Sequence, residues 1–426
     1  MIGAGPAGCA CALSFARRGA RVVVLEAERA APRRLAGEWI HPAGVQVLRR
    51  MGVDLCREAH GSLGQGFIVH PGDGSRPIAL PYPEGGALSL SHANLTEALR
   101  RIVDQRPGIE LITGARVRKV GPFGRVHTSN RTFRGSLIIG ADGRSSVIRA
   151  FLTRGSQDPS GKVTLSHLAG LTLEGALLPT ERYGHIMLGG LGPALAYRLD
   201  EHTVRLCLDV PRTRPRARDL HAYLWDRYAD ALPASLQQPM ATQLQMGRVQ
   251  WAANHFRRRT FYGREGYALV GDAVGHAHPL VASGLTTAFL DAESLARSAN
   301  VATYARERTS QCWTSDRLGA GIYRLFSEDT PTTRALRQAV FGLWRTETHR
   351  RDRSLRLLAM TESRKHILAA AFLNVVGQAL SSRTRHAVVT GRWGELPQEI
   401  TGFLSWLGWL GGPNHGIPPV RKAVTL

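Results

Sequence analysis

The chain is poor in cysteine, and the few cysteines it has form no pattern. Cys9, Cys11, Cys56, Cys207 and Cys312 make up no even framework and no Cys-x-x-Cys pair. A chain of 426 residues can bury a large core without cross-links. This usage therefore predicts a reducing compartment and no structural zinc. Because no His, Asp or Glu cluster has the spacing of a metal site, we expect no metal.

Lysine is almost absent too. Only four of the 55 basic residues are lysines, and the arginines are scattered along the whole chain. With 33 Asp and Glu the formal charge is +22. Nucleic-acid-binding proteins usually concentrate their basic residues in one patch with interleaved aromatics, so no nucleic-acid partner is expected. We interpret the charge as an arginine-rich solvated surface, with attraction to anionic lipid or a phosphorylated cofactor as the alternative.

Long hydrophobic runs are also lacking. The longest candidate, residues 367–380, is shorter than the roughly 20 residues of a membrane span. The chain opens on a glycine-rich turn, so we expect no signal peptide. A composition of 43% hydrophobic and 21% charged residues excludes disordered, collagenous and coiled-coil proteins.

The N-terminal segment carries a nucleotide-binding pattern. Gly3, Gly5 and Gly8 form Gly-x-Gly-x-x-Gly, followed by an Ala-rich helical stretch and a strand at 21–26 that ends on Glu26. In this context the first glycine permits a tight turn, the second lets the backbone approach a pyrophosphate, and the third lets helix and strand pack closely. The pyrophosphate is expected at the helix N-terminus, and Glu26 is expected to accept hydrogen bonds from ribose hydroxyls.

One part of the pattern is missing. A dinucleotide-binding fold needs a strand before the first glycine, and only Met1 and Ile2 precede it. The first strand is therefore either almost absent or begins upstream. We favour a misplaced start.

Two further Gly/Asp elements follow predicted strands. Residues 136–140 read as a buried strand leading to Asp142, and residues 267–270 lead to Gly271 and Asp272. Asp272 is expected to bind a ribityl or ribose hydroxyl, and a helix N-cap is an equally good interpretation of an isolated Asp. Because dinucleotides bind at strand ends, the three elements together predict FAD.

The order of elements predicts an α/β (α+β) fold in three parts. Residues 1–60, 90–150 and 260–300 are assigned to a discontinuous, Rossmann-like FAD-binding domain. Residues 61–89 and 151–259 alternate in short runs and are assigned to an interleaved β-sheet substrate domain. Residues 301–426 are assigned to a C-terminal helical segment.

These motifs resemble those of the class A flavoprotein monooxygenases, which share the p-hydroxybenzoate hydroxylase fold, and most closely the squalene epoxidase family. Residues 34–44 (RLAGEWIHPAG) are similar to the family's R-x-x-G-E-L-L-Q-P-G-G. The resemblance continues through 66–70 (GFIVH), 80–83 (LPYP), 92–95 (HANL), 184–211, 271–273 (GDA) and 278–286 (HPLVASGLT).

The resemblance implies a set of FAD-binding residues. Carried over position by position, and with Asp142 added from the second Gly/Asp element, the set is Gly3, Gly5, Gly8, Glu26, Arg34, Trp39, Val117, Asp142, Asp272, Gly284 and Leu285. No catalytic acid or base is assignable because the flavin performs the chemistry. The substrate-pocket candidates are Phe67, Tyr82 and Pro279.

Four positions depart from the family pattern. Asn94 replaces an arginine of the FAD-binding set, which removes a charge-assisted contact. Phe67 replaces an active-site tyrosine and loses its hydroxyl, and Ala282 and Ser283 replace two glycines beside the flavin. FAD binding is still expected, whereas these departures disfavour squalene itself as the substrate.

The implied activity is epoxidation. NADPH or NADH, directly or through a separate reductase, reduces FAD, and a flavin C4a-hydroperoxide delivers one oxygen atom of O2 to an alkene of squalene or a related isoprenoid lipid. Alternatives are hydroxylation of a quinone or aromatic ring, an isoprenoid-reducing flavoprotein, and a non-catalytic basic lipid-binding protein. A flavin halogenase is disfavoured because no lysine precedes Lys119.

The composition of the C-terminal segment bears on whether the protein associates with a membrane surface. Residues 331–426 hold 14 Lys and Arg against five Asp and Glu, and apolar stretches alternate with arginine clusters. Such a basic, Trp-bearing segment is typical of an interfacial helix, although a helical cap over the substrate domain is an equal alternative. Since the resemblance implies docking on membranes, we expect peripheral membrane association on the cytoplasmic side.

Overall fold

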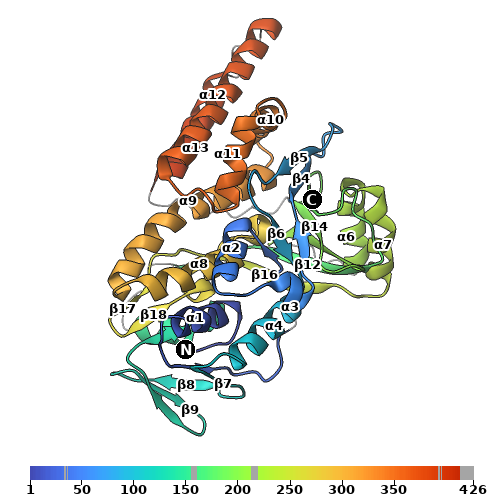
Figure 1. Cartoon of the computed structure of the whole chain (residues 1–426). Coiled ribbons are helices and arrows are strands. Elements are labelled where there is room, and N and C mark those ends of the chain that lie inside the picture. The colour runs from blue at the N-terminus through green and yellow to red at the C-terminus, as the bar shows by residue number, and fades with distance from the viewer. Residues whose placement is uncertain are drawn as a thin grey trace.

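The computed structural model describes residues 1–32, 35, 37–154, 161–212, 219–391, 394 and 396–412, without the side chains of residues 396 and 398. Arg34, one of the predicted FAD-binding residues, lies outside the described residues. Three bodies of structure succeed each other in Figure 1: a nucleotide-binding region at the bottom, a large sheet in the middle and a group of C-terminal helices at the top.

A sheet whose strands are parallel except for the edge strand β17 forms the centre of the nucleotide-binding region. Its strands are β7 (Ile109–Ile112), β1 (Val22–Leu25), β11 (Ile138–Gly140), β18 (Tyr267–Leu269) and β17 (Gly263–Arg264). Ile2 pairs in parallel with both Leu25 and Gly140, and so joins β1 to β11. The first strand that the sequence lacks is therefore represented by one bridging residue at the middle of the sheet.

Helices enclose this sheet. α1 (Pro6–Ala16) packs against α8 (Gly284–Arg297), and both belong to one buried apolar cluster with the strands. The other helices of this region are α2 (Pro42–Arg50), α3 (Leu55–Ala59), α4 (His92–Asp104) and α5 (Val147–Leu152). Two small sheets flank it, β10–β9–β8 (Thr132–Arg134, Arg125–Thr128, Val117–Val120) and β2–β6–β3 (Trp39–Ile40, Ala87–Ser89, Ser62–Gly64).

A seven-stranded sheet adjoins the nucleotide-binding region. Its order is β16 (Gln250–Arg257), β12 (Lys162–Glu174), β15 (Thr203–Pro211), β14 (Ala194–Arg198), β13 (Tyr183–Met187), β4 (Gly66–His70) and β5 (Ile78–Pro81). Only the β13–β4 pair is parallel. Strands from residues 66–81 and 162–257 thus share one sheet, while the exact domain limits remain a prediction.

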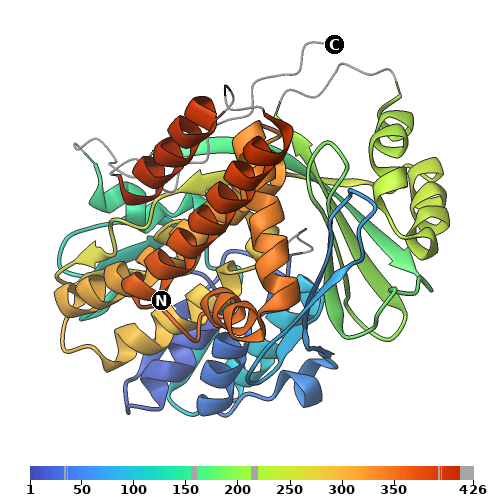
Figure 2. The same cartoon turned by 90° about the horizontal axis from the view of Figure 1, so that it is seen from above.

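Each face of this sheet buries a different apolar cluster. In β15 the side chains of Leu206 and Leu208 pack on one face, and the intervening Cys207 belongs to the cluster on the other, as strand geometry requires. The first face is covered by α6 (Leu220–Tyr228) and α7 (Ala234–Gln245). These two helices lie inside a segment predicted to be sheet, so that prediction is incomplete. Figure 2 shows them on the opposite side of the sheet from the C-terminal helices.

The described part of the C-terminal segment is mainly helical, as predicted. It comprises α9 (Val301–Ser327), α10 (Pro331–Thr346), α11 (Thr348–Leu358), α12 (Lys365–Thr390) and α13 (Leu396–Gly411). Pro331 starts α10 at a position where its missing N–H is harmless. The far end of α12 rises above the rest of the molecule in Figure 1. Short 3₁₀ turns occur at η1 (Gly143–Ser145), η2 (Ala229–Ala231), η3 (Gly271–Ala273) and η4 (Pro279–Val281).

Candidate functional site

The glycine turn at the start of α1 has the geometry of a phosphate site. Gly3 has a φ of +97°, and a Cβ on Gly8 would lie 1.9 Å from the Gly3 carbonyl oxygen. Beside Gly5 there is open space, because a Cβ added there would meet no heavy atom within 4 Å. Gly5 also caps α1 without a side-chain hydrogen bond, so the first N–H groups of α1 face that space. The turn can therefore hold a pyrophosphate on backbone donors and the helix dipole.

Glu26 lies at the end of β1 with its carboxylate already engaged. Its Oε2 accepts from the Ala4 N–H at 2.6 Å and its Oε1 from the Glu28 N–H at 2.8 Å. Arg100 of α4 lies 3.2 Å from the same carboxylate and also donates to the Ala4 carbonyl oxygen at 3.0 Å. Glu26 and Arg100 together fix the glycine turn, and any ribose contact must use the remaining lone pairs of Glu26.

The other two Gly/Asp elements lie at neighbouring strand ends, after β11 and β18. Asp142 accepts from the Val147 N–H through Oδ2, while its buried Oδ1 has no hydrogen-bond partner among the described residues. Burial raises the pKa of Asp142. Arg144 donates to Asp272 at 3.0 Å. Burial acts to raise the pKa of Asp272, but the nearby charge of Arg144, which also donates a hydrogen bond to it, outweighs burial and the net shift is downward.

His276 adds a second unsatisfied group next to Asp272. Both of its ring nitrogens are buried and lack a partner in the described part of the chain. Burial lowers its pKa to about 3, so the ring is neutral at physiological pH. The open space at Gly5 and the orphaned atoms of Asp142 and His276 fit a polar group that spans these strand ends, as FAD would.

The remaining predicted FAD contacts have varied positions. Val117 is buried at the start of β8, and Trp39 is buried in β2. Gly284 and Leu285 open α8, and the space beside Gly284 is free. Asn94, which was singled out as a departure from the expected FAD-binding set, is exposed in the first turn of α4.

A buried hydrogen-bond network connects β2 to η4. Trp39 donates through Nε1 to the Tyr82 hydroxyl at 3.2 Å. His41 Nε2 lies 2.8 Å from the Val281 carbonyl oxygen, which can only accept, so Nε2 carries the ring proton. The other ring nitrogen, Nδ1, then accepts from the Tyr82 hydroxyl at 2.7 Å. Burial lowers the pKa of His41 to about 4 and keeps the ring in this neutral form.

The three substrate-pocket candidates lie around this network, and Phe67 is the one that lines a cavity. Phe67 is 1% exposed, and its ring lies 5.1 Å from that of Trp39 and 6.2 Å, edge to face, from that of Tyr82. Phe67 lines a cavity, whereas Tyr82 contributes its hydroxyl to the network. Pro279 is the first residue of η4 and precedes Leu280 and Val281, which do line the cavity.

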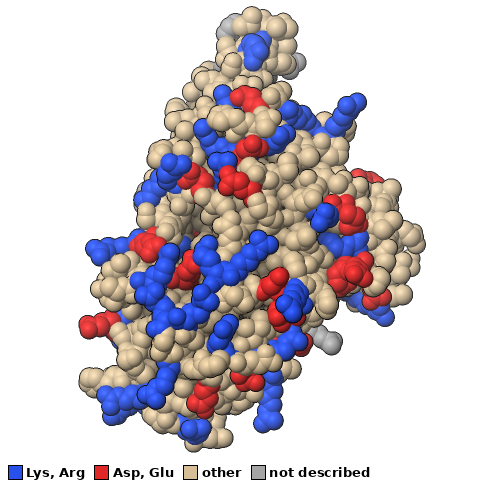
Figure 3. All heavy atoms as spheres, in the orientation of Figure 1, with Lys and Arg blue, Asp and Glu red and all other residues tan. Residues whose placement is uncertain are grey.

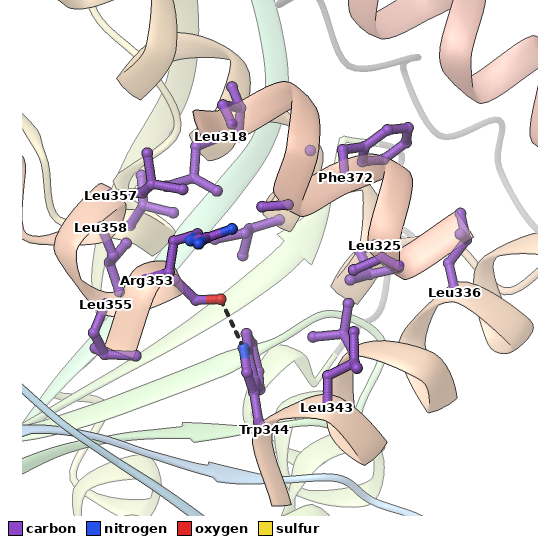
Figure 4. A pocket seen from close by; sticks show the side chains of 18 of the residues that line it. Leu318, Leu325, Leu336, Leu343, Trp344, Arg353, Leu355, Leu357, Leu358 and Phe372 are labelled. Carbon is purple, nitrogen blue, oxygen red and sulfur yellow. Dashed lines mark hydrogen bonds between the residues drawn. The ribbon is translucent and has the colours of Figure 1, made fainter. Parts of the chain in front are cut away.

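The cavity has a volume of about 150 Å³ and is mostly apolar. Its walls come from β4, β5 and β13 of the large sheet, from η4, and from all five C-terminal helices. Figure 4 shows leucines from α9, α10 and α11 converging with Phe372 of α12. None of its described lining residues is Asp, Glu or His. Such a space excludes water and accepts a lipophilic molecule.

A second polar cluster fixes η4 to the large sheet. His278 accepts from the Leu280 N–H through Nδ1, and its Nε2 lies 3.0 Å from Asp209 Oδ1 of β15. Ser166 donates to the same Asp209 oxygen, and Asn254 donates to Ser166 at 2.9 Å. All four side chains are buried. Since one nitrogen of His278 faces both Ser166 and Asp209, the cluster is not arranged as a nucleophile–base–acid relay and serves to hold η4.

Sequence reasoning missed Arg100, His41 and the Asp209 cluster. Arg100 lies six positions after Asn94, on the buried side of α4, and reaches the glycine turn across 96 residues of sequence. The only available signal was an arginine on the apolar side of an amphipathic helix.

Comparison with known proteins identifies the relatives of this chain. A family model described as squalene epoxidase matches residues 134–390, and one described as FAD dependent oxidoreductase matches residues 1–151. Squalene epoxidase erg1 of Aspergillus fumigatus is 28% identical over 381 residues, which is 80% of this chain and 77% of that protein.

Solved structures share the fold. P. aeruginosa PqsL in complex with 2-aminobenzoylacetate superposes with a TM-score of 0.66 at 23% identity, covering 81% of this chain and 98% of PqsL. The p-nitrophenol 4-monooxygenase PnpA from Pseudomonas putida has a TM-score of 0.67 at 18% identity, covering 88% and 96% of the two chains. At these identities the likeness concerns the fold alone.

Proposed function

Because this chain belongs to the squalene epoxidase family, we propose that it is an FAD-dependent monooxygenase that epoxidises squalene or a related isoprenoid lipid. One oxygen atom of O2 enters a carbon–carbon double bond, and the other leaves as water with the two electrons of NADPH and two protons. The observation that carries the proposal is the apolar cavity bounded by η4. This 3₁₀ turn lies just before the start of α8, whose N-terminus has no side-chain cap.

FAD, when bound, supplies the reduction of O2 and the transfer of oxygen. For its part, the chain offers backbone donors at Gly5 for the pyrophosphate and the unsatisfied Oδ1 of Asp142 for a hydroxyl. Asp272, which follows β18, is held by Arg144, and α8 begins at Gly284 with open space beside it. These roles in FAD binding are part of the proposal.

The lining favours an alkene over a phenol. Hydroxylation of a phenol is assisted by a base that removes the hydroxyl proton. No carboxylate or imidazole belongs to the described cavity lining, whereas an alkene requires only apolar contacts and exclusion of water. The network of His41 and the cluster of His278 keep η4 fixed on this side of the cavity.

We propose that the C-terminal helices dock on a membrane surface to collect this substrate. Large apolar side chains are exposed on α12 and α13: Leu373, Val388, Val389 and Leu404 are 57%, 59%, 84% and 61% exposed. Figure 3 shows that the end of α12 at the top of the molecule is mainly uncharged, whereas Lys and Arg are plentiful below it. Such a surface suits an interfacial, cytoplasmic-side attachment, with electrons delivered by NADPH directly or through a reductase.

In the part of the chain that the structure describes, no helix combines the length and hydropathy needed to span a bilayer.

Reconstitution tests the proposed function. The purified full chain should turn yellow with FAD and should oxidise NADPH faster when squalene or a shorter polyprene is added. Stimulation by phenols or quinones without any response to polyprenes would contradict the epoxidase assignment. Failure to take up FAD at all would favour a non-catalytic lipid-binding protein.

A further inference from the structure

The lining of the apolar cavity includes cationic side chains that a hydrocarbon ligand does not explain. Three arginines, Arg317, Arg350 and Arg353, belong to the lining, and no carboxylate does among the described residues. A hydrocarbon needs none of them, because it offers no hydrogen-bond acceptor. Their positions therefore bear on which isoprenoid the proposed epoxidase binds.

Two of the three arginines are satisfied by the protein. Arg350 pairs with Glu347 at 2.7 Å. Arg317 donates to the Leu410 carbonyl oxygen at 3.0 Å and stacks on Trp313 with its guanidinium 3.6 Å from the ring centre.

Arg353 is different. Its one hydrogen bond within the described chain joins Nη2 to the Nε2 atom of His349 at 3.0 Å, and no ion pair links it to a described carboxylate. In Figure 4 its side chain extends from α11 inward on the side of the cavity where Leu318 and Leu357 lie. Asn374 of α12 lines the same cavity, and its carboxamide makes no hydrogen bond with the described residues. Arg353 is thus a half-buried residue of the cavity lining whose guanidinium has unused donors, and a second polar group lines the same cavity.

Filling this cavity with a pure hydrocarbon has an energetic cost. It would strip water from the guanidinium without replacing the lost hydrogen bonds. A carboxylate or phosphate would instead accept two parallel, charge-assisted hydrogen bonds from the fork of Arg353.

We propose that the substrate is an isoprenoid lipid with an acidic end group, a carboxylate or a phosphate, and that Arg353 binds that group. This inference rests on the proposed function and narrows its substrate class. Arg353 is a specificity-determining residue that orients the lipid, while the apolar walls contact its chain.

Binding to the full-length protein tests the inference without turnover. Isothermal titration calorimetry compares farnesoic acid, farnesyl monophosphate and the methyl ester of farnesoic acid, which has the same chain but no charge. The wild-type protein should bind at least one of the two acids about tenfold or more tightly than the ester. Arg353→Leu should weaken binding of that acid about tenfold to a hundredfold and change ester binding little, since a hydrogen bond to a charged group is lost.

Arg356→Leu is the matched control. Arg356 belongs to the same helix, is half-exposed, pairs with Glu84 and does not line the cavity. The preference for acids should survive in this variant. Equal binding of acid and ester by the wild type overturns the inference, as does an equal loss in both variants.

Turnover separates this inference from the proposed function. Rapid oxidation of squalene together with indifference to end-group charge overturns the inference and leaves the epoxidase assignment intact. Acid-selective binding without oxygen transfer to any alkene overturns the epoxidase assignment and leaves the Arg353 site intact.

Discussion

At the residue scale, buried polar side chains determine how η4 faces the cavity. His41 reaches the Val281 carbonyl oxygen across 240 positions of sequence, and Tyr82 accepts from Trp39 and donates to His41. Phe67 has no hydroxyl, and the hydroxyl that joins Trp39 to His41 belongs to Tyr82, whose ring packs edge to face on Phe67. The shape of the site therefore depends on one tautomer of one neutral histidine.

The neutral state of His41 makes folding stability depend on pH. Its pKa is about 4 in the folded protein, against about 6.5 for an unperturbed histidine. Above the pKa of the unperturbed histidine, its contribution to the unfolding free energy is complete. As the pH falls toward 4, the histidine of the unfolded chain binds a proton first, and this contribution is lost. His41→Gln should remove this dependence and make the loss of unfolding free energy between pH 7 and pH 5 smaller by about 2 kcal/mol. Urea denaturation at pH 7 and pH 5 measures this difference in unfolding free energy for the wild type and the variant. An equal loss of unfolding free energy in both proteins would contradict the prediction.

Removing the Tyr82 hydroxyl should destabilise the protein. Tyr82→Phe leaves His41 Nδ1 and Trp39 Nε1 buried without a partner, which costs about 1–3 kcal/mol. Tyr223→Phe is the control, because Tyr223 is only partly buried and makes no hydrogen bond through its hydroxyl with the described residues. Urea denaturation should show a loss for the first variant and almost none for the second.

At the element scale, local patterns were predictable and long-range partners were not. The glycine turn, the strand ends at Asp142 and Asp272 and the start of α8 each follow from a short stretch of sequence. Ser166, by contrast, meets Asp209 and His278 from 43 and 112 positions away, so no local spacing reveals the cluster. Likewise, α6 and α7 lie inside a segment whose flanking strands alternate apolar and polar residues. The prediction of a sheet extended that pattern across the two helices.

The glycine turn yields a prediction that separates folding from FAD binding. A Cβ on Gly5 enters open space and its backbone is extended, so Gly5→Ala should fold normally. The added methyl group would, however, occupy the space assigned to the pyrophosphate and weaken FAD binding about tenfold or more. Fluorescence titration with FAD gives the affinity, and thermal unfolding of the apoprotein gives the stability.

Two glycine variants serve as controls for that prediction. Gly377→Ala, also in open space but in α12, should leave FAD affinity unchanged. Gly8→Ala should prevent folding, because its Cβ would lie 1.9 Å from the Gly3 carbonyl oxygen. Full FAD affinity in the Gly5 variant would show that the pyrophosphate lies elsewhere.

At the scale of the whole molecule, the exposed apolar residues of α12 and α13 lie at one end and the nucleotide-binding region at the other (Figure 1). The sequence indicated a basic, apolar C-terminal segment, but it could not show that the same helices enclose the cavity. That enclosure links substrate collection to the site, because the helices proposed to meet the bilayer are also the cavity walls.

Membrane docking is tested by charge insertion at this end. Val389→Asp combined with Leu404→Asp should reduce co-sedimentation with anionic vesicles about tenfold or more, because each charge must be desolvated at the interface. Phe123→Asp is the control: Phe123 is 77% exposed in the turn between β8 and β9, far from α12 in Figure 1. Equal losses in both proteins would contradict docking through the C-terminal helices.

Oxygen transfer to an isoprenoid alkene is the central claim, and isotope-labelled O2 tests it most directly. The full chain with FAD, NADPH, labelled O2 and squalene, or an isoprenoid acid of the kind proposed to bind Arg353, is analysed by mass spectrometry. We expect an epoxide that contains one labelled oxygen atom, with one NADPH consumed per epoxide. Label only in hydrogen peroxide or water, with the alkene unchanged, would contradict the epoxidase assignment.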